Sequence, residues 1–322
     1  MTQTLKVLCV TGWCRNGSTI IGNILGEVPG FFHVGELHFL WKNAAGLGAN
    51  NRCGCGEALT DCPVWSRVLD GQIPAGTALD RYAATVTAQQ RTYVRTRHTW
   101  RIRRRGPHCD AVREHADRMA RTYQAIGTLT GARIIVDTSK IVGEAALLPY
   151  VEGIEPCYVH LVRDPRAVAC SWRQPKEYVY ALPVSKSTAY WHGFNLAARE
   201  ITKHSPGNSL LLRYEDFIAD PAASVGALLR LCGADPAANP VRGNVVDLHA
   251  NHTVTGNPDR FRTGTTIIRG TDDAWRHGLS VPGKLAVLAL SWPAFGRYGY
   301  RYRGTFRAGP VTTRRQPVGS GA

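Results

Sequence analysis

Short apolar runs bounded by glycine, proline or charged residues recur four times along this 322-residue chain. Runs of this length are typical of strands buried on both faces of a parallel sheet. Helical patterns separate them, so we expect alternating strands and helices joined by right-handed crossovers. The predicted strands are residues 6–10, 133–136, 157–162 and 209–212. The pattern therefore predicts an α/β fold of three layers, with a central parallel sheet and helices on both faces.

The predicted elements fit a single domain over residues 1–302, because one α/β domain of this length is ordinary. A long segment, approximately residues 41–130, separates the first two predicted strands and is expected to add helices that cap a substrate cleft. Residues 303–322 are rich in Gly, Pro, Thr and Arg and have little apolar content. This composition predicts a flexible C-terminal tail.

The first predicted strand leads into a glycine turn and an apolar helix. Gly12 and Gly17 have four residues between them and are followed by Ser18 and Thr19, which is the spacing of a phosphate-binding P-loop. A Walker A motif has lysine where this chain has Ser18, and the positive charge lies instead within the turn, at Arg15. Backbone N–H groups at the start of such a helix bind anions. The turn therefore predicts a P-loop-like site for a phosphate-like anion other than a nucleoside triphosphate.

A second strand, turn and helix follows at residues 160–171. Arg163 stands where the strand ends, Pro165 suits the first position of a helix, and Ser171 lies about two helical turns further on. Two anion sites in one α/β chain predict a ligand with two separated phosphate-like groups.

Together these motifs resemble those of sulfotransferases that use 3′-phosphoadenosine-5′-phosphosulfate (PAPS). The first turn resembles the 5′-phosphosulfate loop of that family, and Arg163 and Ser171 resemble its 3′-phosphate pair, with the same separation of eight residues. The resemblance extends from residue 7 to about residue 300 and points to bacterial enzymes similar to carbohydrate and tyrosylprotein sulfotransferases, with a P-loop-type fold. It implies that the PAPS donor, and its product 3′-phosphoadenosine 5′-phosphate (PAP), bind Arg15, Asn16, Gly17, Ser18, Thr19, Arg163 and Ser171.

Glu36 is the leading candidate for the general base. It follows the first predicted helix, where the chain returns toward the phosphate loop, and related tyrosylprotein and bacterial carbohydrate sulfotransferases have their catalytic glutamate in a Gly-Glu pair at this place. His33 and His38 are rival bases, because many cytosolic members use histidine and a neutral imidazole can accept a proton at pH 7. If Glu36 has no catalytic role, it is expected to be a solvated side chain or a helix cap.

Lys140 follows the predicted strand at residues 133–136, at an end that faces the cleft of a parallel sheet. It can stabilise charge on the bridging oxygen as the S–O bond breaks, and Arg15 can hold the leaving phosphate. A surface lysine beside a helix cap is the alternative. The resemblance also implies donor contacts for Tyr214, Arg260 and Arg269.

Composition narrows the class of protein. Hydrophobic residues make up 44% of the chain, and no apolar run approaches the roughly 18 residues of a membrane span. The first strand begins by about Leu5, which leaves no room for a signal peptide or an anchor, so we expect a bacterial cytoplasmic enzyme whose nine cysteines are reduced. The net charge of +15 predicts attraction to anions without distinguishing a nucleotide from nucleic acid or a membrane surface.

Three cysteines, Cys53, Cys55 and Cys62, lie close together in the sequence. A structural zinc site normally has four ligands, and no fourth follows at finger-like spacing. Ordinary buried thiols are therefore expected, with a metal site and a redox disulfide as alternatives. We predict no metal ligand and no metal requirement.

Seven arginines gather in residues 91–105, together with Tyr93 and Trp100. Such a run is most often a solvated helix face. It can also steer an anionic donor or acceptor toward the cleft, or bind RNA or an anionic membrane surface. No nucleic-acid-binding signature accompanies it.

The sequence as a whole favours a PAPS-dependent sulfotransferase with no nucleic-acid partner. A P-loop kinase or other NTPase is the first alternative, although it would need Mg²⁺ and a lysine at position 18. A basic nucleic-acid-binding module is the second. The acceptor is expected to be a small molecule, a carbohydrate or a natural product, bound by helices within residues 41–130 and 177–203. The sequence indicates neither a particular acceptor nor an oligomeric state.

Overall fold

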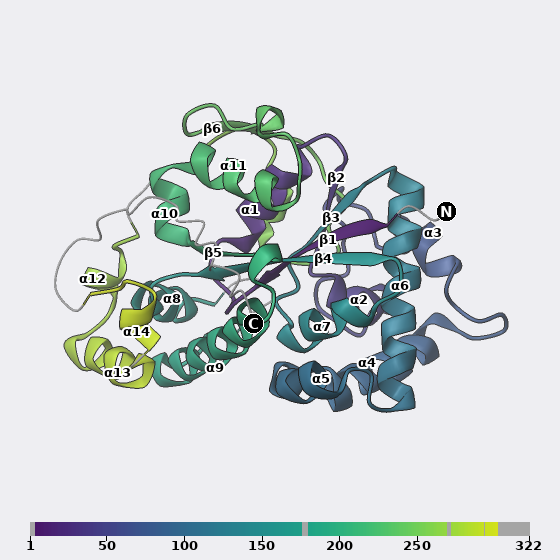
Figure 1. Cartoon of the computed structure of the whole chain (residues 1–322), viewed down its shortest axis with the longest axis horizontal. Coiled ribbons are helices and arrows are strands. Elements are labelled where there is room, and N and C mark those ends of the chain that lie inside the picture. Colours follow the sequence, from purple (N-terminus) through teal and green to yellow (C-terminus); the bar gives the residue numbers. More distant parts are fainter. Residues whose placement is uncertain (1–3, 176–179, 269–271, 293, 302–322) are drawn as a thin grey trace, which may run out of the picture.

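The computed structural model describes residues 4–175, 180–268, 272–292 and 294–301. In this part of the chain, five parallel strands form a central sheet in the order β2-β3-β1-β4-β5 (Figure 1). The strands are β1 (Leu5–Thr11), β2 (Phe31–Gly35), β3 (Ile134–Asp137), β4 (Ile154–Val162) and β5 (Ser209–Arg213). A separate antiparallel pair consists of β6 (Val245–Leu248) and β7 (Gly264–Ile267).

Helices connect these strands and lie against both faces of the sheet (Figure 1). Those of the first half are α1 (Ser18–Gly26), α2 (Leu40–Ala44), α3 (Trp65–Asp70), α4 (Leu79–Tyr93), α5 (Thr99–Arg105), α6 (Asp110–Thr130) and α7 (Val142–Leu147). Those of the second half are α8 (Pro165–Trp172), α9 (Val184–Lys203), α10 (Tyr214–Ala219), α11 (Pro221–Leu231), α12 (Trp275–Gly278), α13 (Val281–Ser291) and α14 (Ala294–Arg297).

The alternation of side chains along β1 divides the core into two layers. Val7 and Cys9 pack on one face with residues of α6, α7 and α9, whereas Leu8 and Val10 pack on the other with residues of α1 and α11. Because successive side chains of a strand point to opposite faces, an unbroken apolar run is needed to fill both layers. Each fully buried aliphatic side chain contributes about 1.5–3 kcal/mol to folding, so this run anchors the centre of the sheet.

The predicted fold class is confirmed: four of the five parallel strands fall on the predicted apolar runs, and helices cover both faces. The strand β2 was not predicted. It is short, lies at an edge of the sheet and contains His33, so its sequence lacks the continuous apolar run of the other strands.

The segment between residues 41 and 130 is helical over much of its length, with α3 to α6 inside it. Helix α6 packs against β1 and β3, which ties this segment to the sheet. The predicted tail, residues 303–322, lies outside the described residues, and the single-domain boundaries stay a prediction. In the described ranges, no helix is both long and apolar enough to cross a membrane.

Candidate active site

One cavity of about 510 Å³ opens at the carboxyl ends of the parallel strands. In open α/β sheets, ligands bind at this edge because the loops after neighbouring strands meet there. Both predicted anion motifs line this cavity, and so do Glu36, Lys140 and Arg15, the three residues predicted for the chemistry. Its lining includes Arg15, Gly17, Ser18, Thr19, Glu36, Lys140, Arg163, Ser171 and Tyr214.

Backbone geometry explains the glycines of the first turn. Gly17 has a φ of 90° and is the N-cap of α1, and a Cβ atom there would lie 2.4 Å from Cδ2 of Tyr214. Among the described residues, no side chain caps this helix at Gly17, and its first turn contains no acidic residue. The helix N-terminus therefore presents backbone N–H groups and a positive dipole to the cavity.

Asn16 shapes the turn from within. Its amide nitrogen donates to the carbonyl oxygen of Leu161 at 2.9 Å, and its amide oxygen accepts a hydrogen bond from the Ser18 N–H at 3.3 Å. The side chain is buried and is not part of the cavity lining. The side-chain contacts of Asn16 therefore fix the loop against β4, and any contact with a donor would come from its backbone.

Arg15 faces the cavity with a guanidinium that is only partly satisfied. Its Cζ atom lies 5.0 Å from the centre of the Trp172 ring, and within the described ranges its Nη2 atom is buried without a hydrogen-bond partner. Arg15 also has a φ of 68°, which is uncommon for a residue with a side chain. An orphaned donor beside a helix N-terminus is suited to holding an anion.

Glu36 and Lys140 form an ion pair at the floor of the cavity. The Nζ atom of Lys140 lies 2.7 Å from Oε1 of Glu36, 3.2 Å from Oγ of Ser18 and 2.6 Å from the carbonyl oxygen of Thr138. Burial alone would lower the pKa of Lys140, but the carboxylates of Glu36 and Asp137 help to raise it above its ordinary value. The lysine is therefore a fixed cation within reach of the phosphate loop.

The turn after β3 positions Lys140. Asp137 accepts hydrogen bonds from the N–H of Ser139 and from the hydroxyl of Tyr123, both at 2.7 Å. This turn gives Lys140 a φ of 63°, and Lys140 and Arg15 are the two non-glycine residues with positive φ in the described part of the chain. Strained backbone of this kind concentrates at functional sites, because the surrounding structure must hold it.

The structure separates the two rival histidines from the cavity. His33 is buried beneath α1, between Oδ1 of Asn23 and Oγ1 of Thr138, and burial lowers its pKa to about 3. His38 pairs with Glu144 at 2.9 Å. Neither histidine lines the cavity that holds Glu36, although His38 lines the adjoining cavity described below. Because Glu144 already pairs with the His38 ring, the geometry favours Glu36 as the base.

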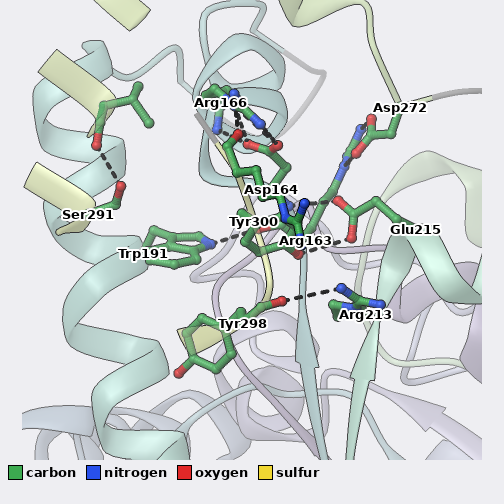
Figure 2. A network of polar contacts seen from close by, with 12 residues as sticks. Arg163, Asp164, Arg166, Trp191, Arg213, Glu215, Asp272, Ser291, Tyr298 and Tyr300 are labelled. Carbon is green, nitrogen blue, oxygen red and sulfur yellow. Dashed lines mark hydrogen bonds and ion pairs between the residues drawn. The ribbon is translucent and has the colours of Figure 1, made fainter. Parts of the chain in front are cut away.

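Arg163 is held in place from three sides. Its Nε donates to Oδ2 of Asp272 at 2.7 Å, and its Nη2 contacts the other carboxylate oxygen of Asp272 (Figure 2). Its Nη1 donates to the carbonyl oxygen of Arg15 at 2.7 Å, and its Cζ lies 4.8 Å from the ring centre of Tyr214. Burial opposes the charge, but Asp272 raises the pKa of Arg163 above its ordinary value. Asp272 thus pairs with Nε and Nη2 of Arg163, and no sequence pattern predicted this pairing.

The acidic residues after β5 make structural contacts, and Figure 2 shows those of Glu215. Glu215 accepts hydrogen bonds from the Asp164 N–H at 2.8 Å and from the Tyr300 hydroxyl at 2.9 Å, and burial raises its pKa to about 7. Asp216 pairs with Arg213 at 2.6 Å. These contacts join β5 to the turn that begins α8.

Arg260 was also predicted to contact the donor, but it is not part of the cavity lining. Arg260 is 1% exposed and donates to Oδ1 of Asn50 and to the carbonyl oxygen of Arg52, both at 2.7 Å. Its guanidinium therefore fastens neighbouring segments of the chain. Arg269 lies outside the described residues.

A second cavity of about 520 Å³ adjoins the first, since Phe39 and Lys42 line both. It lies between α4, α5 and α9, within the two segments predicted to hold the acceptor. Apolar side chains form much of its wall, and part of the arginine run lies around it. Its lining includes Arg91, Arg95, Arg97, Trp100, Tyr190 and Phe194.

Comparison with known proteins agrees with this architecture. The sulfotransferase domain of the olefin synthase from Synechococcus PCC 7002 is 18% identical, covers 94% of this chain and 98% of its own, and superimposes with a TM-score of 0.55. Sulfotransferase STF9 from Mycobacterium avium is 14% identical over 95% of this chain and 79% of its own, with a TM-score of 0.46. The first likeness supports the fold, and the second is too weak to support an argument. No curated protein sequence matches the chain at a significant level.

The family model described as the sulfotransferase family matches residues 8–237, which include both anion motifs, Glu36 and Lys140. The chain belongs to the sulfotransferase family.

Proposed function

We propose that the protein transfers a sulfuryl group from PAPS to a hydroxyl group of a small-molecule or carbohydrate acceptor. The observation that carries this proposal is the meeting of two motifs, 148 residues apart, in one cavity, where Nη1 of Arg163 donates to the carbonyl oxygen of Arg15. A ligand with two separated phosphate groups can contact both motifs at once.

The site offers a binding group for each end of the donor. The N–H groups at the start of α1, together with Arg15, suit the 5′-phosphosulfate, because a helix N-terminus and a buried, unsatisfied guanidinium both favour anions. Arg163 and Ser171 also line the cavity and suit the 3′-phosphate. That phosphate would replace the Asp272 carboxylate on Arg163.

The proposed reaction is an in-line displacement at sulfur. Glu36 takes the proton of the acceptor hydroxyl as its oxygen attacks sulfur, and the bond between sulfur and the bridging oxygen breaks to release PAP. Lys140 and Arg15 stabilise the negative charge that develops on the leaving phosphate. As proposed, the reaction requires no metal, because these side chains supply the positive charge.

The second cavity suits the acceptor. Aromatic side chains such as Trp100 and Tyr190 favour an apolar or aromatic body, and Arg91, Arg95 and Arg97 favour an acceptor that also carries an anionic group. This assigns part of the arginine run to acceptor recognition. Phe39 and Lys42 line both cavities, so an acceptor that extends past them would bring its hydroxyl toward Glu36.

A nucleotide panel separates the proposal from its two alternatives. Binding of PAP without Mg²⁺ supports the sulfotransferase. Mg²⁺-dependent hydrolysis of ATP would support a kinase or NTPase instead. Nucleic-acid binding that is abolished by substituting the arginines of residues 91–105, and unaffected by Arg15→Ala, would support a binding module.

The acceptor is best sought directly. Incubation with ³⁵S-labelled PAPS and fractionated cell extract should label a discrete product, which mass spectrometry can identify. Absence of any labelled product across fractions that contain apolar hydroxyl compounds would contradict the proposed acceptor class.

A further inference from the structure

The three clustered cysteines have a fourth partner that lies far away in the sequence. His252, which is 190 residues after Cys62, places its Nδ1 atom 3.3 Å from the Cys62 sulfur and 3.7 Å from the Cys53 sulfur. The Cys53 and Cys62 sulfurs are 3.5 Å apart. Together with Cys55, these side chains offer four potential ligand atoms within 4.8 Å of one another.

The separations among Cys53, Cys62 and His252 are close to those of a tetrahedral metal site. Zn–S bonds of about 2.3 Å and Zn–N bonds of about 2.0–2.1 Å place two sulfurs about 3.8 Å apart, and a sulfur and a nitrogen about 3.6 Å apart, around one ion. The three separations described above lie within a few tenths of an ångström of these values. The Cys55 sulfur lies within 4.8 Å of the other three ligand atoms, and an inward turn of this side chain would complete the coordination.

The backbone is arranged to present the sulfurs from a tight turn. The Cys53 N–H donates to the carbonyl oxygen of Glu57 at 2.7 Å, and the Gly56 N–H donates to the carbonyl oxygen of Cys53 at 2.9 Å. Gly56 has a φ of 97°, which a residue with a side chain rarely adopts. This turn brings Cys53 and Cys55 to the same point, as a pair of ligands requires.

Two further contacts hold His252 against the turn. The indole nitrogen of Trp65 donates to the carbonyl oxygen of His252 at 2.7 Å, and the Gly54 N–H donates to the carbonyl oxygen of Thr253 at 2.9 Å. A Cβ atom on Gly54 would lie 2.1 Å from Oδ1 of Asn251, so the close approach of the two segments depends on this glycine.

We propose that Cys53, Cys55, Cys62 and His252 bind one zinc ion in a closed Cys₃His site. Three thiolates and one imidazole in tetrahedral array are the ligand set that zinc prefers. Four protein ligands leave no open position for water or substrate, so the site is structural. A disulfide between Cys53 and Cys62 would explain neither Cys55 nor His252.

This zinc ion would stabilise one wall of the active-site cavity without contacting the substrates. The metal joins residues 53–62 to residues 252–256, and the second segment forms part of the cavity wall. The carbonyl oxygen of Thr255 accepts from the Glu36 N–H at 3.2 Å, and the carbonyl oxygen of Gly256 accepts from the amide of Asn50 at 3.2 Å. Loss of the ion is therefore expected to loosen the wall beside Glu36.

The metal content of the full chain tests the proposal. Protein purified without a metal-affinity step should contain about one zinc ion per chain by inductively coupled plasma mass spectrometry. Cys62→Ser and His252→Ala should lower the content at least fivefold, whereas the matched controls Cys109→Ser and His249→Ala should leave it unchanged. A wild-type protein with little zinc, or a Cys62→Ser protein with wild-type zinc, would overturn the proposal.

Cobalt substitution provides a readout that needs no variant. Wild-type protein loaded with Co²⁺ should show the intense visible bands of a tetrahedral ion and sulfur-to-cobalt charge-transfer bands in the near ultraviolet. The weak visible spectrum of octahedral Co²⁺, or a Cys53–Cys62 disulfide found in freshly purified protein by non-reducing peptide mapping, would contradict the site. Because these measurements use the unaltered chain, they remain decisive if the variants fail to fold.

Discussion

Lys140 lies 2.7 Å from the carboxylate of Glu36, although 104 residues separate them in the chain. The same ammonium group lies 3.2 Å from the hydroxyl of Ser18, the residue that stands in place of a P-loop lysine. The turn after β3 therefore supplies a lysine ammonium beside the position where a P-loop would have its own lysine. This arrangement puts a candidate base and a candidate leaving-group cation in direct contact before any substrate binds.

Replacing Glu36 by glutamine removes the proposed base while keeping the size of the side chain. We expect kcat to fall by about 10²–10⁴-fold, the usual contribution of a general base, with PAP affinity nearly unchanged. Initial rates with labelled PAPS and isothermal titration with PAP measure the two effects. Glu27→Gln serves as a control outside the cavity, and wild-type turnover in Glu36→Gln would remove Glu36 from this role.

The Glu36–Lys140 contact predicts that the two residues act as a unit. Lys140→Met should lower kcat/KM by about 10²–10³-fold, the range found for removing one group that stabilises transition-state charge. The double variant should lose little more than the worse single variant, because each substitution already disables the pair. A double-mutant cycle of kcat/KM tests this. Losses that simply multiply would show that the two residues act independently.

Arg163 is predicted to recognise the 3′-phosphate. Arg163→Ala should therefore weaken binding of PAP, while binding of adenosine 5′-phosphosulfate, which lacks that phosphate, should change little. General damage to the site would weaken both nucleotides, so the ratio of the two dissociation constants reports the contact between Arg163 and the 3′-phosphate. An equal loss for both nucleotides would place the 3′-phosphate elsewhere.

Gly17 offers a test of the loop geometry. Alanine at position 17 combines a φ of 90° with a contact of 2.4 Å to the Tyr214 ring, whereas alanine at position 46 meets a φ of 69° in open space. We expect Gly46→Ala to cost about 1 kcal/mol of unfolding free energy and Gly17→Ala at least about 1 kcal/mol more. Urea unfolding measures both, and Gly17→Ala alone should also weaken PAP. Equal losses of unfolding free energy in the two variants would mean that the Tyr214 ring moves aside without a cost in stability.

The lowered pKa of His33 predicts that the free energy of unfolding decreases on acidification. Its pKa is lowered to about 3 in the folded protein, so below pH 6.5 the unfolded chain binds a proton that the native site refuses. Stability from this group is therefore full above pH 6.5 and falls as the pH decreases toward 3, by about 1 kcal/mol between pH 6.5 and 5.5. Glu215, whose raised pKa acts in the opposite direction, is present in wild type and variant alike.

The difference between wild type and His33→Gln isolates the histidine. Urea unfolding at the two pH values should show a wild-type loss larger than that of the variant by about 1 kcal/mol. An identical pH dependence in both proteins would mean that folding does not lower the pKa of His33.

Local patterns made the sheet and the phosphate loop predictable. The spacing of Gly12 and Gly17 is a property of one turn, and the apolar runs that became β1, β3, β4 and β5 had to fill two core layers. The sequence pattern did not predict strand β2, because an edge strand of five residues needs no continuous apolar run.

Long-range partners could not be predicted from the sequence. Asp272 is 109 residues from Arg163, and His252 is 190 residues from Cys62, so no spacing rule connects them. Asn16 and Arg260 lie in motifs that suggested ligand contacts, yet their side chains bond to backbone and to neighbouring segments. Sequence identified the residue types of the site, and only the fold shows which of them face the cavity.

A crystal structure of the protein soaked with PAP tests the central claim most directly. We expect the 5′-phosphate against the N–H groups at the start of α1 and beside Arg15, and the 3′-phosphate on Arg163 and Ser171 in place of the Asp272 carboxylate. PAP bound outside this cavity, or bound with Arg163 still paired to Asp272, would contradict it.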